Sequence, residues 1–397
     1  MSLVLALNGG SSSLKFALFR TAAAGAGASD APHERIAAGR FDTPIAPETE
    51  RAAAADAALE QVAQAIAKHA RLDAIDAAGH RIVHGGPHYT APTRITPEVI
   101  ETLRALAPFD PEHLPMEIAL IEALARRAPA ATQVACFDTA FHAGLPRVAR
   151  LLPIPRRFEA LGVRRYGFHG LAYASIIERL RREGRPGEAD GRLVLAHLGN
   201  GASLAAVHGG KPIDTTMAFT PAAGVPMGRR SGDLDPGLVA WLATTEGMSI
   251  EAFNRMVHEE SGLLGISETS GDVRDLLARE AADPRAREAL DLFCYEVRKR
   301  IGAFAAALGG IDTLVFSGGI GENAALIRAR IAAGLEFLGV RLDTARNAAG
   351  RAGRDGVRQG ISAPVISATG APVTVRVITT DEEGEIARSV VGLMKPA

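Results

Sequence analysis

A segment that occurs twice constrains the fold of this chain more than any other feature. Residues 3–19 read LVLALNGGSSSLKFALF and residues 193–207 read LVLAHLGNGASLAAV, and the two match at seven positions when they are aligned without a gap. Each copy predicts a short apolar strand, a turn of Gly, Ser or Asn, and a second apolar strand. Small residues at such a turn let backbone N–H groups approach an anion closely. Two such hairpins, one near the start of each half, predict a duplicated domain that holds a phosphate from both sides.

The length and composition of the chain bound its class. Its 397 residues exceed one ordinary core, so two domains are expected, and 47% apolar residues supply both interiors. The net charge of −1 gives no electrostatic reason to expect nucleic acid or a membrane surface as a partner. Cys136 and Cys294 lie far apart without a C-x-x-C motif, which predicts reduced core residues of a cytoplasmic protein. No stretch approaches the roughly 18 apolar residues of a membrane-spanning helix, and the start of the chain does not resemble a signal peptide.

Apolar strand patterns alternate with helical ones along the chain, which predicts an α/β fold with mixed sheets. The repeated hairpin favours two lobes, with the active site in the cleft between them, over a single doubly wound sheet. We expect an N-terminal lobe of residues 1–148, completed by about residues 383–397, and a C-terminal lobe of residues 149–382.

Polar residues concentrate on the two predicted turns. The first hairpin carries Asn8, Ser11, Ser13 and Lys15, and the second carries His197, Asn200 and Gly201. Amides, hydroxyls and a lysine suit the terminal oxygens of a phosphate and a hydrated Mg²⁺, which takes oxygen ligands. An ordinary solvated turn is the alternative for either hairpin alone, and the repetition favours the ligand site.

A second glycine-rich segment, SGGIGEN at residues 317–323, lies between a predicted strand and a predicted helix that begins at Ala324. Backbone N–H groups and the helix dipole at such a junction favour a nucleotide phosphate or ribose. Gly319, Gly321 and Ala324 also fit the G-x-G-x-x-A pattern of dinucleotide-binding folds, with Asp343 roughly 20 residues on. An NAD-dependent oxidoreductase is therefore the alternative, although that pattern normally opens its domain and leaves the twin hairpins without a role.

Two arginines lie on glycine-rich turns rather than on helices. Arg81 precedes the Gly85-Gly86 turn, and Arg230 lies in the long loop FTPAAGVPMGRRSGDLDPG. Phosphoryl transfer between two anions needs fixed positive charge around the equatorial oxygens, and arginine supplies it in a planar fork. His169, in YGFHG, is a candidate for the same oxygens, and Asp138 ends a buried strand, where open α/β sheets bind ligands.

Eight segments closely resemble, in the same order, the motifs of the acetate kinases: LALNGGSSSLKFALF, GHRIVHGG, CFDTAFHAGLP, RRYGFHG, HLGNGAS, DTTMAFTPAAGVPMGRRSGDLDPG, SGGIGEN and TDEEGEIAR. The resemblance runs from Leu3 to Arg388. It implies the acetate and sugar kinase, Hsp70 and actin superfamily, with two duplicated actin-like (ribonuclease H-like) domains. It further implies a homodimer that makes acetyl phosphate from acetate and ATP with Mg²⁺, Mn²⁺ being the alternative metal. The N-terminal lobe would serve the carboxylate and phosphate, and the C-terminal lobe the nucleotide.

The same resemblance implies a role for each matched position. Asn8 and Glu382 would hold the metal, although Glu382 and Glu383 on sequence alone are carboxylates that complement a helix dipole. Asp138, His169 and Arg230 would be catalytic, and Arg81, Val83 and Pro221 would bind the carboxylate. Lys15, with Ser11 and Ser13, would contact the nucleotide phosphates. The nucleotide would bind to His197, Leu198, Gly199, Asn200, Gly201, Asp272, Val273, Arg274, Gly319, Ile320, Gly321, Glu322 and Asn323.

The chain departs from the family pattern at three positions. Gly9 replaces the usual Cys or Ala, Asp110 stands where a substrate-side histidine is expected, and Arg229 stands where threonine is commoner. The last two changes lie near the carboxylate or the transferring phosphate. The choice between acetate, propionate and a longer acid therefore stays open.

The expected mechanism is direct in-line transfer of the γ-phosphoryl group to a carboxylate oxygen. An ionised carboxylate needs no general base, so positioning and charge neutralisation supply most of the rate. Asp138 is therefore expected to orient Arg81 or Mg²⁺. A chaperone-like ATPase of the same superfamily is a further alternative, but it would leave Arg81 and Arg230 without a role.

Overall fold

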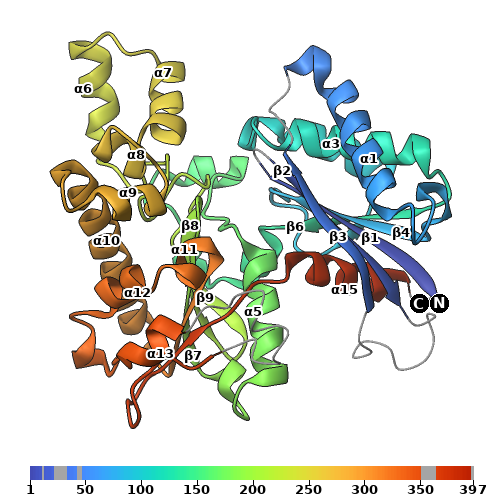
Figure 1. Ribbon diagram of the computed structural model, residues 1–397. Coiled ribbons are helices and arrows are strands. Elements are labelled where there is room, and N and C mark those ends of the chain that lie inside the picture. The colour runs from blue at the N-terminus through green and yellow to red at the C-terminus, as the bar shows by residue number, and fades with distance from the viewer. Residues whose placement is uncertain (11–12, 22–33, 43–46, 350–363, 395–397) are drawn as a thin grey trace. The chain divides into compact units, whose positions relative to one another are not determined.

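The computed structural model describes residues 1–10, 13–21, 34–42, 47–349 and 364–394. The chain forms two compact units, which are described separately. Unit 1 contains Met1–Ala143, Gly170–Ser175 and Asp381–Ala397, and unit 2 contains Gly144–His169 and Ile176–Thr380. Each unit has a mixed sheet flanked by helices, so the predicted α/β class is confirmed (Figure 1).

Unit 1 is built on a six-stranded sheet in the order β3-β2-β1-β4-β6-β5. The first three strands in sequence are antiparallel neighbours, β4 and β6 add in parallel beside β1, and β5 is an antiparallel edge strand. The strands are β1 (Ser2–Gly9), β2 (Ser13–Thr21), β3 (Glu34–Asp42), β4 (Ala77–Ile82), β5 (Thr93–Arg94) and β6 (Thr132–Phe137).

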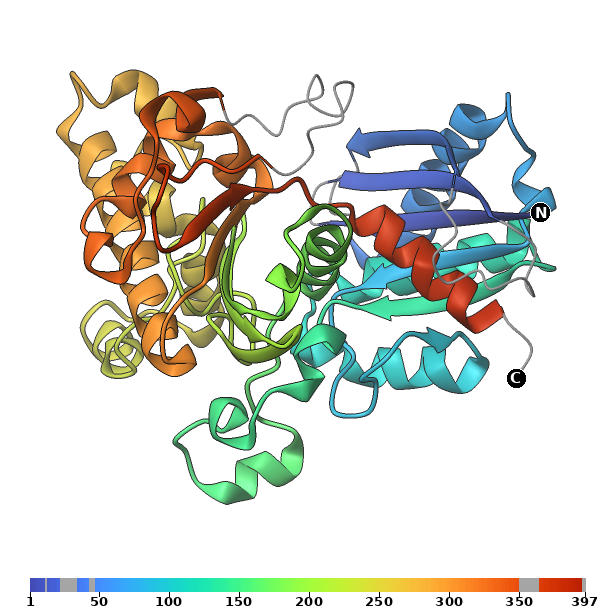
Figure 2. The same cartoon turned by 90° about the horizontal axis from the view of Figure 1, so that it is seen from below.

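Helices cover both faces of this sheet, so β1 is buried on both sides and reads as a continuous apolar run. Leu5 and Leu7 contribute to a core with α1 and α3, whereas Val4 and Ala6 contribute to a core with α15. Successive side chains of a strand point to opposite faces, which explains this division. Figures 1 and 2 show α15 on the face opposite α1 and α3. The helices of unit 1 are α1 (Arg51–Ile66), α2 (Pro97–Leu106), α3 (Leu114–Arg127) and α15 (Glu382–Met394).

Unit 2 repeats the topology of unit 1. Its five-stranded sheet has the order β11-β10-β7-β8-β9, with β7, β8 and β9 antiparallel and β10 and β11 added in parallel beside β7. Read from the third strand of each unit, β3-β2-β1-β4-β6 corresponds to β9-β8-β7-β10-β11. The duplication predicted from the sequence is thus present in the strand order. The strands are β7 (Arg192–Leu198), β8 (Ala202–His208), β9 (Lys211–Thr215), β10 (Thr313–Ser317) and β11 (Thr374–Val377).

The gapless alignment of the two hairpins holds only for their first strands. Leu5 pairs with Leu18, so its counterpart Leu195 should pair with His208, but Leu195 pairs with Ala205. Hairpin register follows the length of the turn, and the second turn is shorter. The matches at Ser13 and Leu14 therefore do not mark equivalent positions, whereas those before the turns do.

The remaining helices belong mainly to unit 2. The longest of them, α10, begins and ends at residues that typically cap helices. Asp283 caps the N-terminus of α10 by accepting from the amides of Arg285 and Ala286, Pro284 takes the first turn, and Gly309 ends the helix in the left-handed conformation. The α- and π-helices are α4 (Arg147–Arg150), α5 (Gly170–Glu183), α6 (Gly237–Thr245), α7 (Ile250–Arg255), the π-helix η7 (Met256–Glu260), α8 (Gly262–Ser267), α9 (Val273–Arg279), α10 (Pro284–Leu308), α11 (Gly318–Asn323), α12 (Ala325–Ala332) and α13 (Thr344–Ala349). Short 3₁₀ helices are η1 (Glu48–Glu50), η2 (Leu72–Ala74), η3 (Ala107–Phe109), η4 (Ala140–Gly144), η5 (Arg156–Leu161), η6 (Glu188–Asp190) and η8 (Glu336–Leu338).

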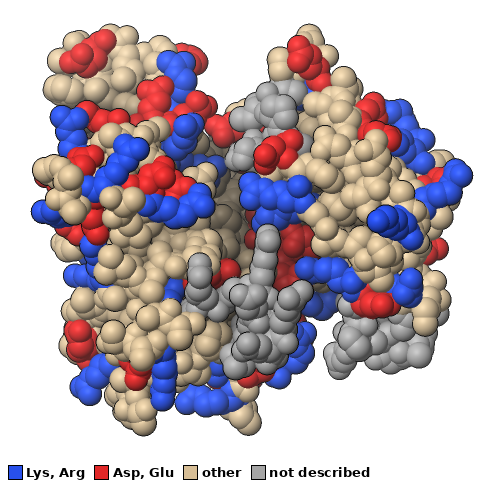
Figure 3. Space-filling model, in the orientation of Figure 1, with Lys and Arg blue, Asp and Glu red and all other residues tan. Residues whose placement is uncertain are grey.

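The surface matches the balanced charge of the sequence. Lys and Arg side chains lie among Asp and Glu side chains over each unit on the face drawn in Figure 3. Within the described residues, every helix is too short or too polar to cross a lipid bilayer.

Helix α15 lies directly against the backbone of β4 at Gly79. A Cβ atom at Gly79 would lie 2.3 Å from Ile386 Cγ2 and 2.7 Å from Val390 Cγ2. Gly79→Ala is therefore expected to lower the free energy of unfolding by about 1–3 kcal/mol, because the overpacked helix must shift. Chemical denaturation of the purified variant measures this loss.

Gly302→Ala is the matched control, because Gly302 lies inside α10 and an added Cβ atom there would have no neighbouring atom within 4 Å. Alanine is the better helix former by about 0.5–1 kcal/mol, so this variant is expected to be slightly stabilised. Equal effects of the two substitutions would show that α15 does not pack on Gly79 as described.

Candidate functional site

Arg81, near the end of β4, is held by fixed acceptors on two other segments of unit 1. Its Nε and Nη2 donate to Asp138 Oδ2 at 2.9 and 2.6 Å, and its Nη1 donates to the carbonyl oxygen of Gly9 at 2.6 Å. Burial alone would lower the pKa of the guanidinium, but the charges of Asp138, Glu117 and Glu382 raise it. Arg81 is therefore a permanent cation with a fixed orientation, and the carboxylate of Asp138 is committed to it.

Asn8, at the end of β1, meets the first residues of α15. Its Nδ2 donates to Glu382 Oε2 at 2.7 Å and to Glu383 Oε1 at 2.9 Å. Burial raises the pKa of Asp138; the charge of Arg81 opposes this rise and that of Glu382 adds to it. The structure thus brings together Asn8 and Glu382, the two residues expected to hold a metal, beside Asp138 and Arg81.

The donor set at Asn8 and Glu382 suits Mg²⁺ better than a transition metal. Among the described residues, no three His, Cys, Asp or Glu side chains are grouped so that they could hold a metal ion. Mg²⁺ does not require such a cage, since it is usually bound by one or two carboxylates together with water and substrate phosphates. One amide and two converging carboxylates therefore fit this ion.

The rest of the first hairpin is only partly described. Lys15 lies opposite Asn8 in the β1–β2 pair, which places both side chains on the same face. Ser13 is buried, and its carbonyl oxygen accepts from the amide of Gly10 at 2.8 Å. Ser11 lies outside the described residues.

Three buried polar residues lie near Arg81; sequence reasoning noted Asp110 as a departure from the family pattern but missed Glu117 and His113. Glu117 Oε2 accepts from the amide of Val83 at 3.0 Å, and Asp110 Oδ1 lies 2.7 Å from His113 Nδ1 and accepts from the amide of His113 at 3.0 Å. Asp110, which stands where a histidine was expected, thus holds a histidine three positions later. A signal for Glu117 exists: it lies at helical spacing within the apolar stripe of α3 formed by Leu114, Ile118 and Ile121.

In unit 2, His169 and Arg230 converge on the turn of the second hairpin. His169 has a left-handed backbone with φ of 59°, and its Nδ1 lies 2.9 Å from Ser203 Oγ. A Cβ atom at Gly201 would lie 3.4 Å from His169 Nε2 and 3.7 Å from Arg230 Nη1. The rings of His169 and His197 are 4.9 Å apart, and His197 Nδ1 lies 3.2 Å from Ser317 Oγ. A cation and two imidazoles therefore surround a turn of small residues.

The long loop at residues 219–237 packs against the same turn. The amide of Gly228 donates to the carbonyl oxygen of Asn200 at 3.0 Å, and a Cβ atom at Gly228 would lie 2.3 Å from Asn200 Oδ1. Gly271 lies against Gly228 in turn, with its own added Cβ 2.5 Å from the Gly228 carbonyl oxygen. Pro221 lies half-buried at the start of this loop, and Arg229 is exposed.

Residues 272–274 follow Gly271 in the chain and form the N-terminal cap and first residues of α9. Asp272 Oδ1 accepts from the amide of Arg274 at 2.8 Å and from its Nε at 3.0 Å, while Val273 is buried. The exposed guanidinium of Arg274 thus lies over the start of α9, beside the residues that touch Asn200.

The segment SGGIGEN differs from its prediction, because Gly318–Asn323 is itself the helix α11 rather than a loop before a helix. Glu322 Oε1 accepts from the amide of Gly318 at 3.1 Å, and Asn323 Nδ2 donates to the carbonyl oxygen of Gly319 at 2.9 Å. Arg328 Nη1 donates to the carbonyl oxygens of Gly321 and Glu322 at 2.8 and 3.0 Å. Side chains from both ends thus hold a glycine-rich turn that is helical against its propensity.

Helix α11 also adjoins the second hairpin. A Cβ atom at Gly318 would lie 2.6 Å from the carbonyl oxygen of Leu198, and one at Gly199 would lie 3.9 Å from the amide nitrogen of Gly319. Gly318 has a φ of +75°, so a side chain there would be strained as well as crowded. The nucleotide positions expected on the hairpin and on SGGIGEN, the latter including Ile320, are therefore neighbours.

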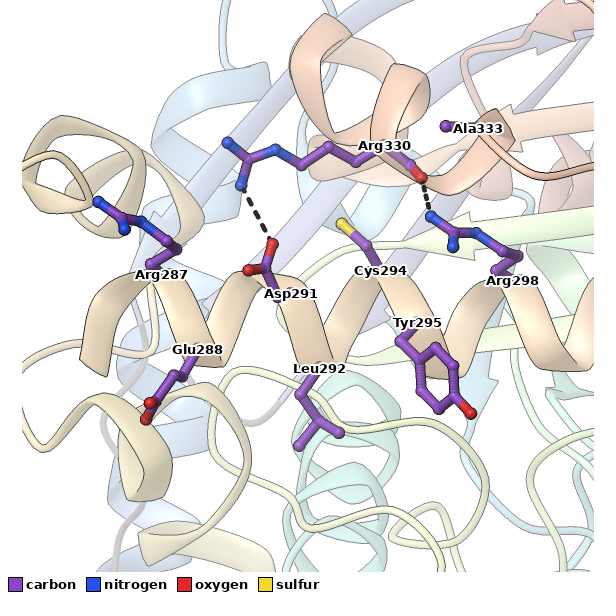
Figure 4. Close-up of a pocket in the computed structure, with 9 residues that line it drawn as sticks. All are labelled: Arg287, Glu288, Asp291, Leu292, Cys294, Tyr295, Arg298, Arg330 and Ala333. Carbon is purple, nitrogen blue, oxygen red and sulfur yellow. Dashed lines mark hydrogen bonds and ion pairs between the residues drawn. The ribbon is translucent and has the colours of Figure 1, made fainter. Parts of the chain in front are cut away.

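A pocket of about 760 Å³ between α10 and α12 is lined by none of the residues expected in the site. Figure 4 shows Asp291 and Cys294 directed toward Arg330 of α12, whereas Glu288, Leu292 and Tyr295 point away from it. Burial raises the pKa of the Cys294 thiol to about 12, so the protonated thiol is favoured at neutral pH.

Comparison with known proteins gives consistent relatives over the full length. The model of the acetokinase family matches residues 3–388. The chain is 43% identical over 403 aligned residues to the acetate kinase of Rhodopseudomonas palustris (strain TIE-1), covering 98% of this chain and 97% of that one. Its structure is similar to the acetate kinase of Porphyromonas gingivalis, with 32% identity, a TM-score of 0.84 and full coverage of both chains. It is also similar to a propionate kinase of Francisella tularensis, with 30% identity, a TM-score of 0.85 and coverage of 99% of this chain and 100% of that one.

Proposed function

Because the chain belongs to the acetokinase family, we propose that it catalyses the reversible transfer of the γ-phosphoryl group of ATP to acetate, giving acetyl phosphate and ADP. The observation that carries this proposal is the pair of cationic centres: Arg81 fixed by Asp138 in unit 1, and Arg230 beside His169 in unit 2. One cation is needed for the carboxylate and one for the phosphoryl group in transfer. In this proposal Arg81 serves the carboxylate, and Arg230 serves the phosphoryl group that is transferred to it.

In this mechanism the carboxylate is bound by Arg81 and attacks the γ-phosphorus directly, with ADP leaving in line. Acetate is ionised at neutral pH, so no side chain has to remove a proton. Asp138 is already engaged with Nε and Nη2 of Arg81, which supports a role in orientation rather than in base catalysis. Arg230 and His169 neutralise charge that develops on the equatorial oxygens, which is where phosphoryl transfer gains most of its rate.

The nucleotide is assigned to unit 2, where the turn at Asn200, the segment at Asp272 and helix α11 are neighbours. Mg²⁺ is assigned to Asn8 and Glu382, and when bound it neutralises phosphate charge and orients the γ-phosphate. Lys15 is assigned to the same phosphate, and its position opposite Asn8 on the same face of the sheet supports this assignment.

A homodimer in the cytoplasm completes the proposal. The dimer is supported by the family resemblance. The cytoplasmic location is supported by Cys136 and Cys294, which are buried free thiols, as is usual in a reducing compartment.

The oxidoreductase alternative fails on topology. A dinucleotide-binding fold opens with parallel strands joined by crossover helices, whereas unit 2, which holds the glycine-rich segment, opens with the consecutive antiparallel strands β7, β8 and β9, as unit 1 does with β1, β2 and β3. Propionate is the alternative substrate, because Asp110, which pairs with His113, stands where the family resemblance implies a substrate-side histidine, and a propionate kinase is among the similar structures.

The test is formation of acetyl hydroxamate from acetate, ATP and Mg²⁺ in the presence of hydroxylamine, extended to propionate and butyrate. The expected result is ATP-dependent hydroxamate, with kcat/KM falling by about 10-fold or more from the best acid to butyrate, because an extra methylene in a small apolar pocket is worth about 10–200-fold. ATP hydrolysis without carboxylate dependence would refute the proposal.

A further inference from the structure

Glu117 contacts both residues assigned to the carboxylate in unit 1. It lies in the first turn of α3 with 4% of its surface exposed. Its Oε2 accepts from the amide of Val83 at 3.0 Å, and its Oε1 lies 3.5 Å from Arg81 Nη1. Within the described residues, Oε1 is fully buried and makes no hydrogen bond. One carboxyl group thus reaches the wall residue and the cation of the same site.

The geometry places Glu117 in competition with an incoming carboxylate. Asp138 occupies Nε and Nη2 of Arg81, and the carbonyl oxygen of Gly9 accepts from Nη1, which is also the nitrogen nearest Glu117. An ionised Glu117 would share the charge of Arg81 and repel a second anion in a buried setting, where such repulsion is poorly screened. A protonated Glu117 would instead have an O–H donor, and it could still accept from Val83.

Opposing effects from the surroundings of Glu117 bring its pKa close to neutral pH. Burial raises its pKa to about 7, against the lowering effects of Arg81, the Val83 amide and His113, while the charge of Asp110 raises it. Asp138 and Glu382 influence Glu117 indirectly, because both also interact with the positive charge of Arg81.

We propose that Glu117 is a positioning residue for the carboxylate substrate: it holds the Val83 amide and the Nη1 edge of Arg81, and it takes up a proton as the carboxylate binds. This inference rests on the proposed function, since it concerns the acid bound at Arg81. The proton comes from solvent and forms the Glu117 O–H bond, and it returns to solvent when the acid leaves.

The direct test is calorimetric titration of the full-length protein with acetate, in the presence of Mg²⁺ and a non-hydrolysable ATP analogue. Titrations at about pH 7.5 in two buffers of different ionisation enthalpy give the number of protons taken up. We expect a clear fractional uptake by the wild type and almost none by Glu117→Gln, which keeps an acceptor for Val83 but cannot titrate. Absence of uptake by the wild type overturns the proposal, whether or not the variant folds.

Steady-state kinetics supply the second readout. With MgATP saturating, KM for the carboxylate is expected to rise above about pH 7 by up to about tenfold per pH unit in the wild type, and to stay flat in Glu117→Gln. A purely structural role would change KM equally at every pH, and superimposable profiles would overturn the proposal.

Asp110→Asn is the matched control, because Asp110 is a buried carboxylate close to the same residues but paired with His113. It is expected to retain proton uptake, with the pH dependence shifted to lower pH because the charge of Asp110 helps to raise the pKa of Glu117. Loss of uptake in this variant instead would assign the proton to the Asp110–His113 pair and overturn the proposal. The two hypotheses fail separately: absence of hydroxamate with every acid refutes the kinase, whereas the calorimetric result decides Glu117.

Discussion

Arg230→Ala is expected to lower kcat by about 10³-fold and to leave KM for the carboxylate within a few-fold of the wild-type value. Arginines that stabilise the charge of a transferring phosphoryl group are worth about 10³–10⁵ in kcat, and their effect appears in the transition state rather than in ground-state binding. Arg230 Nη1 lies close to the Gly201 turn, on the side occupied by His169 Nε2. Initial rates over a matrix of carboxylate and MgATP concentrations separate the two constants.

Arg255→Ala is a suitable control, because Arg255 is exposed and pairs only loosely with Glu260 at 3.2 Å. It is expected to retain wild-type kinetics. If Arg230→Ala turned over normally, the phosphoryl group would have to be stabilised elsewhere, and the role given to Arg230 would have to be abandoned.

Arg81→Ala is expected to raise KM for the carboxylate by about 10²–10³-fold, because a buried, hydrogen-bonded charge pair with the substrate is lost. KM for MgATP should change far less, since the nucleotide is assigned to unit 2. Arg81→Lys keeps the charge but not the planar fork, so its KM for the carboxylate should lie between those of the wild type and of Arg81→Ala. An unchanged KM in Arg81→Ala would mean that the acid binds elsewhere.

The same substitution has a pH-dependent cost in stability. Without Arg81, the buried carboxyls of Asp138 and Glu117 lose their main cationic partner, and their pKa values rise further above those of the unfolded chain. Groups with a raised folded-state pKa stabilise the protein at low pH and lose this contribution as the pH rises through that value. The stability deficit of Arg81→Ala relative to the wild type should therefore be smallest near about pH 5 and grow toward about pH 8, as measured by denaturant titration at each pH.

Local signals explain which elements were predictable. The bounds of helix α10 are marked in the sequence itself, because Asp283 and Pro284 are typical of a helix start and Gly309 is typical of a helix end. Helix α11 was missed because its glycines oppose a helix, and the side chain of Arg328 that holds its C-terminal carbonyls becomes significant only in the folded chain. Strand β3 carries no continuous apolar run, and it is ordered by pairing with β2.

The residues of the candidate site also divide into those that a local sequence signal indicated and those that only the folded chain brings together. Arg81 was a candidate because a glycine-rich turn follows it, and Asp138 because it ends a buried strand; Arg81 proves to lie within β4, which is a parallel neighbour of the strand before Asp138. Asn8 and Glu382 are 374 residues apart, and only the family resemblance joined them before the structure did. Glu117 lies in neither a glycine-rich segment nor a family motif. Its contact with Val83 therefore becomes visible only when α3 is packed in the folded chain.

The position of α15 has a consequence for synthesis of the protein. This helix follows unit 2 in the sequence, yet it covers Val4 and Ala6 of the first strand and places Glu382 beside Asn8. A ribosome-bound chain that still lacks α15 exposes one apolar face of the first sheet and has no partner carboxylates for Asn8. The first unit therefore cannot complete its core, or the geometry around Asn8, until the whole of unit 2 has been synthesised.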